Sequence, residues 1–298
     1  MSILIFGKNG QIGKELVLSL GKNMEIHAFN SKEVNFLDIK NLEKKIDIIK
    51  PKIIINAAAY TKVDEAEKNK KEAFMINSEA VGFIASKAKE NGSRLIHFST
   101  DYVFNGNKKT AYKENDPTDP INVYGRSKLR GEDLIINSKC NYLIIRTSWV
   151  ISKYRNNFLS KIIDQMLNRG ELKIVKDQYG TPSSANFVAK VVKKIIDSDK
   201  NIKEGVYHCS NSGIVSWYEI TQYVYKYLRR TSYKSKNRKI KNLMKKNLLI
   251  EPILSKDLDV LAKRPKFSQL NCSKLEKTLD YKFPVWQEEI KKIIKEII

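Results

Sequence analysis

Short apolar runs alternate with amphipathic segments along the first half of the chain. The runs are typical of buried strands, whereas the segments between them repeat apolar residues at helical spacing. The predicted strands are Ile3–Phe6, Glu25–Phe29, Ile53–Asn56, Arg94–Phe98 and Tyr142–Arg146. The predicted helices are Gln11–Leu20, Asn41–Ile49, a long stretch from Glu72 to Glu90, and Val123–Ser138. This alternation predicts the α/β class, with a doubly wound parallel sheet covered by helices on both faces.

The alternation weakens after Trp149. Strands are predicted at Leu172–Val175 and Val206–His208, and helices at Asn186–Asp197 and Trp217–Arg229. Three prolines then predict a loop-rich tail, namely Pro252, Pro265 and Pro284. We therefore expect a large part over residues 1–150 and a smaller C-terminal lobe over residues 151–298, with some segments of the second part returning to the first.

Composition narrows the class of protein without changing this picture. The chain has 298 residues, of which 42% are hydrophobic, and this is ordinary for a globular protein. Its longest apolar runs, such as Ile53–Ala59, are far shorter than the ~20 residues of a membrane span. The N-terminus leads straight into a predicted strand and does not resemble a signal peptide. We expect a cytoplasmic protein with no membrane partner.

Cysteine and histidine are rare and scattered. With an odd number of cysteines and no metal-ligand spacing, neither a disulfide framework nor a metal site is expected, and the histidines are interpreted as packing residues. These residues are Cys140, Cys209, Cys272, His27, His97 and His208.

The net charge of +22 is the one unusual bulk property. Lysine and arginine crowd the stretch Arg229–Lys246, which holds no acidic residue. A basic surface can attract nucleic acid, an anionic membrane or a polyanionic metabolite. Because no helix-turn-helix, zinc-finger or RNP motif accompanies it, we interpret it as a solvated face and expect no nucleic-acid partner.

Three glycines lie between the first predicted strand and the first predicted helix. Gly7, Gly10 and Gly13, with Gln11 and Ile12, form a G-x-x-G-x-x-G loop. Glycine permits the tight turn and lets backbone N–H groups approach a pyrophosphate at the positive end of a helix. The position indicates a Rossmann-type, dinucleotide-binding domain over residues 1–150, which leaves the C-terminal lobe to bind substrate.

The end of the second predicted strand bears on the choice of cofactor. An acidic residue there would select NAD by binding the ribose 2′-hydroxyl. The sequence instead has Asn30, Ser31 and Lys32, and no carboxylate until Glu33. Ser31 and Lys32 could receive a 2′-phosphate, which favours NADPH and leaves NADH as the alternative.

A tyrosine and a lysine four residues apart open the helix Val123–Ser138. Tyr124 and Lys128 project from the same helix face, and the strand Arg94–Phe98 runs into Ser99 and Thr100. A nearby ammonium is expected to lower the pKa of a phenol towards the range of a proton donor, and a strand-end hydroxyl can polarise a carbonyl. Together with the glycine loop, the set predicts a hydride-transfer enzyme of the short-chain dehydrogenase type.

Several longer motifs resemble the dTDP-4-dehydrorhamnose reductase family and together span the chain. They are Gly7–Gly13, Asn56–Tyr60, Val63–Glu67, Ser99–Phe104, Asn122–Lys128, Arg146–Trp149, Asp177–Pro182, Arg264-Pro265 and Cys272–Glu276. The resemblance implies NAD(P)H-dependent reduction of the 4-keto group of dTDP-4-dehydro-L-rhamnose to dTDP-L-rhamnose, for cell-surface polysaccharide synthesis.

The resemblance also implies roles for single residues. Tyr124 would protonate the sugar C4 oxygen, Lys128 would hold the nicotinamide ribose, and Thr100 would bond the carbonyl oxygen. Further residues would line the cofactor, namely Gly10–Gly13, Asn30, Ser31, Asp38, Ile39, Ala58, Ala59 and Tyr60. Others would touch the substrate, namely Asp101, Val103, Phe104, Trp149 and Arg264.

Structural roles stay open for several of these residues. Asp38 could cap a helix, Asp101 could brace the turn after Thr100, and Trp149 could belong to the core. Arg264 suits a diphosphate, yet it also lies in a run of basic residues.

Pairing of two chains is a further question that the resemblance raises. Some family members pair through acidic residues and a metal ion. Glu15 could take part, but Asn186 stands in place of a second carboxylate, so no metal is expected and a homodimer is left open.

Two other functions remain as alternatives. One is another nucleotide-4-keto-sugar reductase or epimerase, and the other is a non-catalytic Rossmann-fold regulatory subunit. The joint presence of Thr100, Tyr124 and Lys128 argues against the second.

Overall fold

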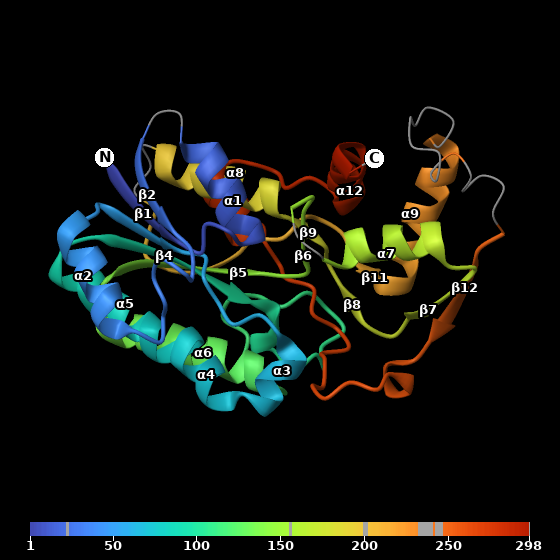
Figure 1. Cartoon of the computed structure of the whole chain (residues 1–298), viewed down its shortest axis with the longest axis horizontal. Helices are drawn as coiled ribbons and strands as arrows, with labels where there is room; N and C mark the ends of the chain where they lie inside the picture. Colours follow the sequence, from blue (N-terminus) through green and yellow to red (C-terminus); the bar gives the residue numbers. More distant parts are fainter. Residues whose placement is uncertain (22–23, 155–156, 199–201, 232–240, 242–246, 298) are drawn as a thin grey trace.

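Six parallel strands form the central sheet of the molecule, which we describe from a computed structural model (Figure 1). The structure describes every residue except 22–23, 155–156, 199–201, 232–240, 242–246 and 298. Most of the basic run Arg229–Lys246 therefore lies outside the described residues. The sheet order is β10-β5-β4-β3-β1-β2. Its strands are β1 (Ser2–Phe6), β2 (Glu25–Phe29), β3 (Ile53–Asn56), β4 (Arg94–Thr100), β5 (Asn141–Thr147) and β10 (Gly205–His208).

Helices cover both faces of this sheet, as the apolar strands require. They are α1 (Gln11–Leu20), α2 (Ile39–Ile49), α3 (Val63–Lys68), α4 (Lys70–Phe74), α5 (Ala80–Glu90), α6 (Val123–Ser138), α8 (Ala185–Asp197) and α11 (Ser273–Leu279). On one face, Leu16 of α1 and Phe187 of α8 pack against Ile3 and Ile5. On the other face, helices α2, α5 and α6 pack against residues of the opposite parity, such as Leu4. The predicted Rossmann-type α/β fold is confirmed.

The long helix predicted from Glu72 to Glu90 contains an irregular turn. A π-helical segment, Met75–Glu79, joins α4 to α5. Such segments widen a helix by one residue and often lie at functional sites. No pattern of apolar residues predicts this insertion.

A second group of elements packs around its own apolar cluster. Its members are α7 (Phe158–Asn168), α9 (Trp217–Thr231), α12 (Trp286–Ile297), β6 (Val150–Ile151), β7 (Glu171–Val175), β8 (Tyr179–Gly180), β9 (Ser183–Ser184), β11 (Val215–Ser216), β12 (Leu249–Ile253) and the short 3-10 turn Ser255–Asp257. The strands pair two by two, as β6 with β9, β7 with β12 and β8 with β11. Leu159, Leu172, Val224 and Ile290 belong to the shared cluster.

The prediction of a loop-rich tail is wrong in part, because the tail holds β12, α11 and α12. Pro252 lies within β12, a strand of a two-stranded sheet with only β7 beside it. An edge strand tolerates a residue without an N–H group. Pro284 lies just before α12, where its missing donor also costs little.

Segments from the second half return to the central sheet, as the sequence led us to expect. Helix α8 packs on α1, β10 extends the sheet beyond β5, and α11 packs on β10. The division into a cofactor domain and a substrate lobe near residue 150 stays a prediction.

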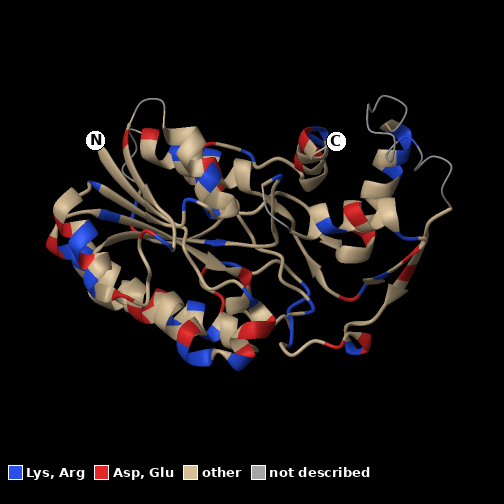
Figure 2. Cartoon of the chain, in the orientation of Figure 1, with Lys and Arg blue, Asp and Glu red and all other residues tan. Residues whose placement is uncertain are grey.

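Charged residues are spread along the outer helices. Figure 2 shows Lys and Arg interleaved with Asp and Glu along α2, α4 and α5. Among the described residues, none of the helices combines the length and the apolar character that crossing a bilayer demands.

Candidate functional site

The predicted site residues gather at the carboxyl ends of β1, β4 and β5, beside the beginnings of α1 and α6. Parallel strands place their carboxyl ends on one edge of a sheet, where ligands of open α/β folds bind. The loops at this edge carry the glycines, Thr100 and Tyr124.

The glycine loop has the geometry that a dinucleotide requires. Gly7 has φ +86°, and a Cβ atom there would lie 2.7 Å from the Ala57 backbone. A Cβ on Gly13 would lie 2.1 Å from the carbonyl oxygen of Gly7. Helix α1 follows with no side-chain cap and no acidic residue in its first turn. The loop residues therefore fit a pyrophosphate bound by backbone N–H groups at a helix N-terminus.

Two of the predicted cofactor residues use their side chains elsewhere. Gln11 donates to the carbonyl of Val150 and accepts from Ser152 and Asn157, so its amide ties α1 to the second group of elements. Asp38 caps α2 by accepting from the backbone N–H of Asn41. Gln11 and Ile39 are half-buried and Asp38 is exposed, and contact of these three residues with a cofactor stays a prediction.

The loop after β2 holds its one nearby carboxylate in a closed set of contacts. Glu33 pairs with Lys8 at 2.8 Å and accepts from the backbone N–H of Asn30. These two hydrogen bonds lower the pKa of Glu33. Ser31 and Lys32 are exposed beside them. A carboxylate engaged in this way is poorly placed to accept from a ribose hydroxyl.

The segment after β3 is held by the π-helical turn. The backbone N–H of Tyr60 donates to Asn77 at 2.8 Å, and the Asn77 amide donates to the carbonyl of Tyr60 and to Ser127. Asn77 lies in Met75–Glu79 and is completely buried. The half-buried Ala58 and Ala59 precede Tyr60. One asparagine therefore fixes the predicted cofactor loop relative to α6.

Thr100 ends β4 and opens a short 3-10 turn, Asp101–Val103. Its hydroxyl donates to Asp101 at 3.0 Å and accepts from the backbone N–H of Tyr102. The Asp101 carboxyl is buried, and its Oδ2 atom has no partner among the described residues. Burial raises the pKa of Asp101 to about 7, against the lowering effect of hydrogen bonds from Ser268 and Thr100.

Helix α6 brings Tyr124 to this turn through a close crossing. A Cβ atom on Gly125 would lie 2.2 Å from the carbonyl oxygen of Tyr102, so only glycine fits there. Asn122 caps the helix by accepting from Gly125 at 2.7 Å. The Tyr124 hydroxyl consequently reaches Thr100.

The pKa of Tyr124 departs from the expectation based on sequence. Burial raises it to about 12, and the hydrogen bond with Thr100 offsets only part of this effect. The expected lowering by Lys128 is not observed in this structure. A phenol with a raised pKa is fully protonated at neutral pH and can serve as a proton donor.

Lys128 turns away from Tyr124 towards the sheet. Its Nζ atom lies 3.0 Å from Nε2 of His97 and donates to the carbonyl of Phe98 at 2.6 Å. All of these atoms are buried, and burial lowers the pKa of Lys128 to about 8, although Glu132 opposes the shift.

Three buried polar atoms near the ends of β4 and β5 have no partner among the described residues. They are Ser99 Oγ, Asp101 Oδ2 and Thr147 Oγ1. Buried polar groups are nearly always hydrogen-bonded, so unpaired ones suit the binding of a polar ligand.

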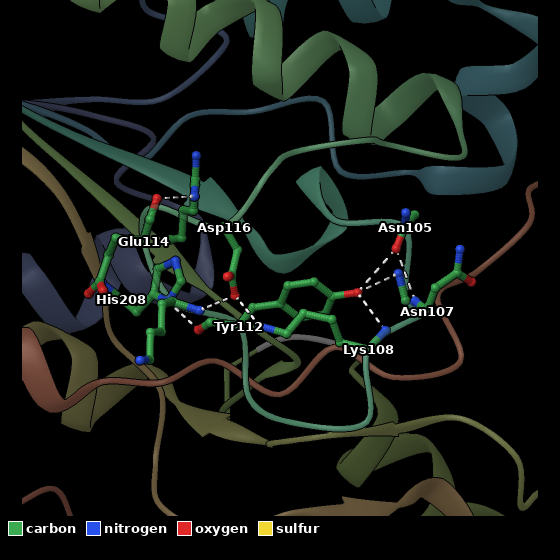
Figure 3. Close-up of polar contacts among 10 residues, drawn as sticks. Asn105, Asn107, Lys108, Tyr112, Glu114, Asp116 and His208 are labelled. Carbon is green, nitrogen blue, oxygen red and sulfur yellow. Dashed lines mark hydrogen bonds and ion pairs between the residues drawn. The ribbon is translucent and has the colours of Figure 1, made fainter.

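Val103 and Phe104 do not face an open space. Both are fully buried, and Phe104 stacks on Tyr112 with ring centroids 4.2 Å apart. The Tyr112 hydroxyl donates to Asn105 and accepts from the backbone N–H of Lys108 (Figure 3). The side chains of Val103 and Phe104 belong to an apolar cluster with Tyr112 and Leu270, and contact of either residue with a substrate stays a prediction.

Trp149 lies between the two groups of elements in an unusual backbone conformation. It has φ +43° and stacks on Trp217 with ring centroids 3.6 Å apart. A Cβ atom on Gly180 would lie 2.6 Å from its ring. The ring is half-buried, so one part of it is available to a ligand.

Arg264 is already paired in this structure. It forms a two-pronged contact with Asp64 of α3, with Nη2 and Oδ2 2.5 Å apart. Binding a diphosphate would require Arg264 to share or leave this partner.

Glu15 and Asn186 contact each other within the chain. The Asn186 amide donates to the Glu15 carboxylate at 2.7 Å across the α1–α8 packing. Within the described ranges, no group of three or more His, Cys, Asp or Glu side chains could hold a metal ion.

Sequence analysis missed Asn56 and Asn77 as site residues and interpreted His97 only as packing. All three are fully buried polar residues. The available signal was a polar residue inside an apolar run, at the end of β3 and in β4, but it does not identify the partner.

Comparisons with known proteins show which family this chain resembles over its whole length. The family model described as RmlD substrate binding domain matches residues 1–298. A dTDP-4-dehydrorhamnose reductase of Sinorhizobium fredii is 35% identical over 99% of this chain and 97% of its own length. The dTDP-4-dehydrorhamnose reductase of Escherichia coli K12 is also 35% identical, over 100% of this chain and 98% of its own length. The crystal structure of the Bacillus anthracis enzyme in complex with NADP has a TM-score of 0.89 and 32% identity, covering 99% of both chains.

Proposed function

The chain belongs to the RmlD substrate binding domain family, that of the dTDP-4-dehydrorhamnose reductases, and on that premise we propose how its site works. It is an NAD(P)H-dependent oxidoreductase that reduces dTDP-4-dehydro-L-rhamnose to dTDP-L-rhamnose, a step of rhamnose supply for polysaccharides. The observation that carries the mechanism is the contact of Tyr124 with Thr100, which lies at the carboxyl end of β4 in a Rossmann-type sheet.

When bound, the reduced cofactor would supply the hydride for C4 of the sugar, and the residues of this chain would handle the proton. Tyr124, protonated because of its raised pKa, gives its proton to the C4 oxygen. The Thr100 hydroxyl holds that oxygen in line, and Lys128 holds the nicotinamide ribose. Gly7, Gly10 and Gly13 let the backbone of the α1 N-terminus hold the pyrophosphate.

For the remaining residues we propose binding roles. Asp101, whose Oδ2 is unpaired among the described residues, bonds a sugar hydroxyl, and Trp149 packs against the base or sugar ring. Arg264 binds the diphosphate while it remains anchored by Asp64. Ala58, Ala59 and Tyr60 line the cofactor.

We propose NADPH as the preferred cofactor. Glu33 is engaged by Lys8 and by the backbone of Asn30, so this carboxylate is not free to receive a ribose 2′-hydroxyl. Asn30, Ser31 and Lys32 surround the place where a 2′-phosphate would lie, and the net positive charge favours the more anionic cofactor.

We also propose a cytoplasmic enzyme without a nucleic-acid partner. All three cysteines are free, as is usual in a reducing compartment. A homodimer stays an open alternative.

Substitution of Tyr124 tests the mechanism. Tyr124→Phe removes the proton donor and leaves the glycine loop intact, so kcat should fall by about a hundredfold or more while the Kd for NADPH stays nearly unchanged. The rate is measured as loss of NADPH absorbance with enzymatically made dTDP-4-dehydro-L-rhamnose, and the product is identified as dTDP-L-rhamnose.

Two controls accompany this experiment. NADH in place of NADPH ranks the cofactors, and other nucleotide-4-keto sugars define the substrate. Wild-type turnover by Tyr124→Phe would refute the assigned role. Failure of the wild-type protein to oxidise either cofactor, despite binding it, would instead refute the proposed substrate.

A further inference from the structure

A chain of buried hydrogen bonds leads from the backbone after β3 to Lys128. Asn56 of β3 and His97 of β4 are paired neighbours in the sheet, and their side chains meet at 3.1 Å between Nδ2 and Nδ1. The other ring nitrogen of His97, Nε2, lies 3.0 Å from Nζ of Lys128. Asn56 and His97 have no exposed surface, and Lys128 is 1% exposed.

The orientation of the Asn56 amide is fixed by a backbone group. The N–H of Ala58 donates to Asn56 Oδ1 at 3.1 Å. Since an N–H group can only donate, the oxygen must face Ala58, and the NH₂ group must face His97. If the amide were reversed, the NH₂ group of Asn56 would face the backbone N–H of Ala58, and two donors would meet with no acceptor between them.

This orientation determines which nitrogen of His97 carries a proton. The Asn56 NH₂ group donates to Nδ1, so Nδ1 must be the unprotonated acceptor. A neutral imidazole then carries its proton on Nε2. The imidazolium form is excluded by the same donor, and complete burial keeps the pKa of His97 well below its usual range.

The proton on Nε2 points at Lys128. An ammonium group has three donors and no acceptor, so it would oppose the N–H of His97. A neutral amine fits, because its lone pair accepts from His97 while one of its N–H groups donates to the carbonyl of Phe98.

We propose that Asn56 and His97 are positioning residues that hold Lys128 as a neutral amine until the cofactor and substrate bind. This deepens the proposed function and rests on it only for its catalytic consequence. While Lys128 is neutral, Tyr124 has no neighbouring cation, so it keeps its proton in the unliganded enzyme and is ready to donate it once the ligands bind. Burial shifts the pKa of Lys128 in the direction of the neutral amine and raises the pKa of Tyr124, but the neutral state of Lys128 is inferred from the donor and acceptor geometry at His97.

Other titratable groups around Lys128 do not supply a free negative charge. Glu132, one turn further along α6, is buried but is bound by Arg146 of β5 in a two-pronged pair. From the turn after β4, Asp101 is engaged by Thr100. Tyr124, on α6 itself, is uncharged at neutral pH because burial raises its pKa.

Nitrogen NMR of the histidine rings tests the proposal directly. The chain has only three histidines, so ¹⁵N-histidine labelling gives a simple spectrum whose ring shifts distinguish the two tautomers and the charged form. His208 is an internal reference, because its Nδ1 must donate to the carbonyl of Tyr112 (Figure 3). His97→Gln assigns the His97 signals by their loss.

In protein without added cofactor, His97 should carry its proton on Nε2 and stay uncharged from about pH 5 to pH 9, opposite in tautomer to His208. A proton on Nδ1 of His97, or a charged ring near neutral pH, would overturn the proposal. This measurement needs no turnover, so it stands even where the substrate assignment fails.

Asn56→Asp adds a switch of tautomer. A carboxylate still accepts from Ala58 but can only accept from His97, so the His97 proton should move to Nδ1 and Lys128 should become an ammonium. The alkaline limb of the kcat/KM profile, which reports ionisations of the enzyme before substrate binds, should then move to lower pH by about one unit or more, because a nearby cation lowers the pKa of Tyr124.

The signal of His208 must stay unchanged in Asn56→Asp, which shows that the fold is intact. A moved tautomer with an unmoved alkaline limb would refute the catalytic consequence. Where Asn56→Asp does not fold, the wild-type spectrum alone decides on the tautomer.

Discussion

At the scale of single residues, buried charge is what holds the catalytic helix to the sheet. Arg146 of β5 bonds Glu132 of α6 through Nε and Nη2, and the two side chains are 5% and 1% exposed. The guanidinium also lies over the Phe104 ring. Because Glu132 lies one turn from Lys128, this pair fixes both the axial position and the rotation of α6.

Removing one partner of the Arg146–Glu132 pair should lower the free energy of unfolding far more than replacing both partners with apolar residues. Arg146→Met leaves Glu132 buried without its partner and should lower the free energy of unfolding by about 3–5 kcal/mol. The double variant Arg146→Met/Glu132→Leu should recover most of that loss. The midpoint of urea-induced unfolding and the dependence of the unfolding free energy on urea concentration give the stability of each variant. Equal losses of stability in the single and the double variant would contradict this prediction.

Some site residues could be predicted from the sequence, whereas others depend on contacts between distant elements. Thr100, Tyr124 and Lys128 were predicted together because strand ends and helix spacing are local properties. Asn56, Asn77 and His97 act across three elements, and their partners follow only from the register of β3 with β4 and from the crossing of α6. The burial of Val103 and Phe104 was not predicted either, because a motif does not reveal which way a side chain points.

At the scale of elements, the turn from β1 into α1 is the most constrained part of the site. The carbonyl oxygen of Gly7 receives the backbone N–H of Gly10 and leaves no room for a side chain on Gly13. The three nearest atoms that a Cβ on Gly13 would meet belong to the backbone, so no rotamer change relieves the clash.

Gly13→Ala should therefore distort the loop and weaken NADPH binding by about tenfold or more, which corresponds to about 1.4 kcal/mol. Gly170→Ala is the matched control, because a Cβ atom there meets nothing within 4 Å. Fluorescence titration of NADPH measures both Kd values. Equal affinities in the two variants would refute the role of this packing.

Element boundaries near the sheet were predictable, since buried parallel strands and amphipathic helices leave clear patterns. Strands β2 and β3 and helices α1 and α6 begin and end as predicted. The π-helical turn Met75–Glu79 and strand β12 could not be predicted from the sequence, for distinct reasons. The first depends on the crossing of α6 near Asn77, and the second on β7 lying beside it.

At the scale of the whole molecule, a contact between distant segments closes one side of the site. Arg264 and the backbone N–H of Ala262, which follow β12, both bond Asp64 of α3. Burial raises the pKa of Asp64, but hydrogen bonds from Arg264 and Ala262 outweigh it, so the pKa lies below its usual value.

This contact should make a pH-dependent contribution to stability. A carboxyl with a depressed pKa in the folded state stabilises it above the unfolded pKa of about 3.9 and loses that effect as the pH falls through the folded value. Asp64→Asn should be less stable than wild type by about 0.5–1 kcal/mol at pH 7, and the difference should vanish below about pH 3. Thermal unfolding across this range measures it, and a constant difference would contradict the prediction.

The order in which the chain is synthesised matters because its second half returns to the first. When the first 150 residues have been made, the sheet still lacks β10, and one of its faces lacks α8 and α11. Phe187, Leu275 and Phe283 all join the apolar cluster on that face. Ile3 and Ile5 are synthesised long before Phe187, Leu275 and Phe283, which pack in the same apolar cluster. A fragment ending near residue 150 would expose this face, so the cover of the sheet that carries the glycine loop is completed only after Phe283 has been released.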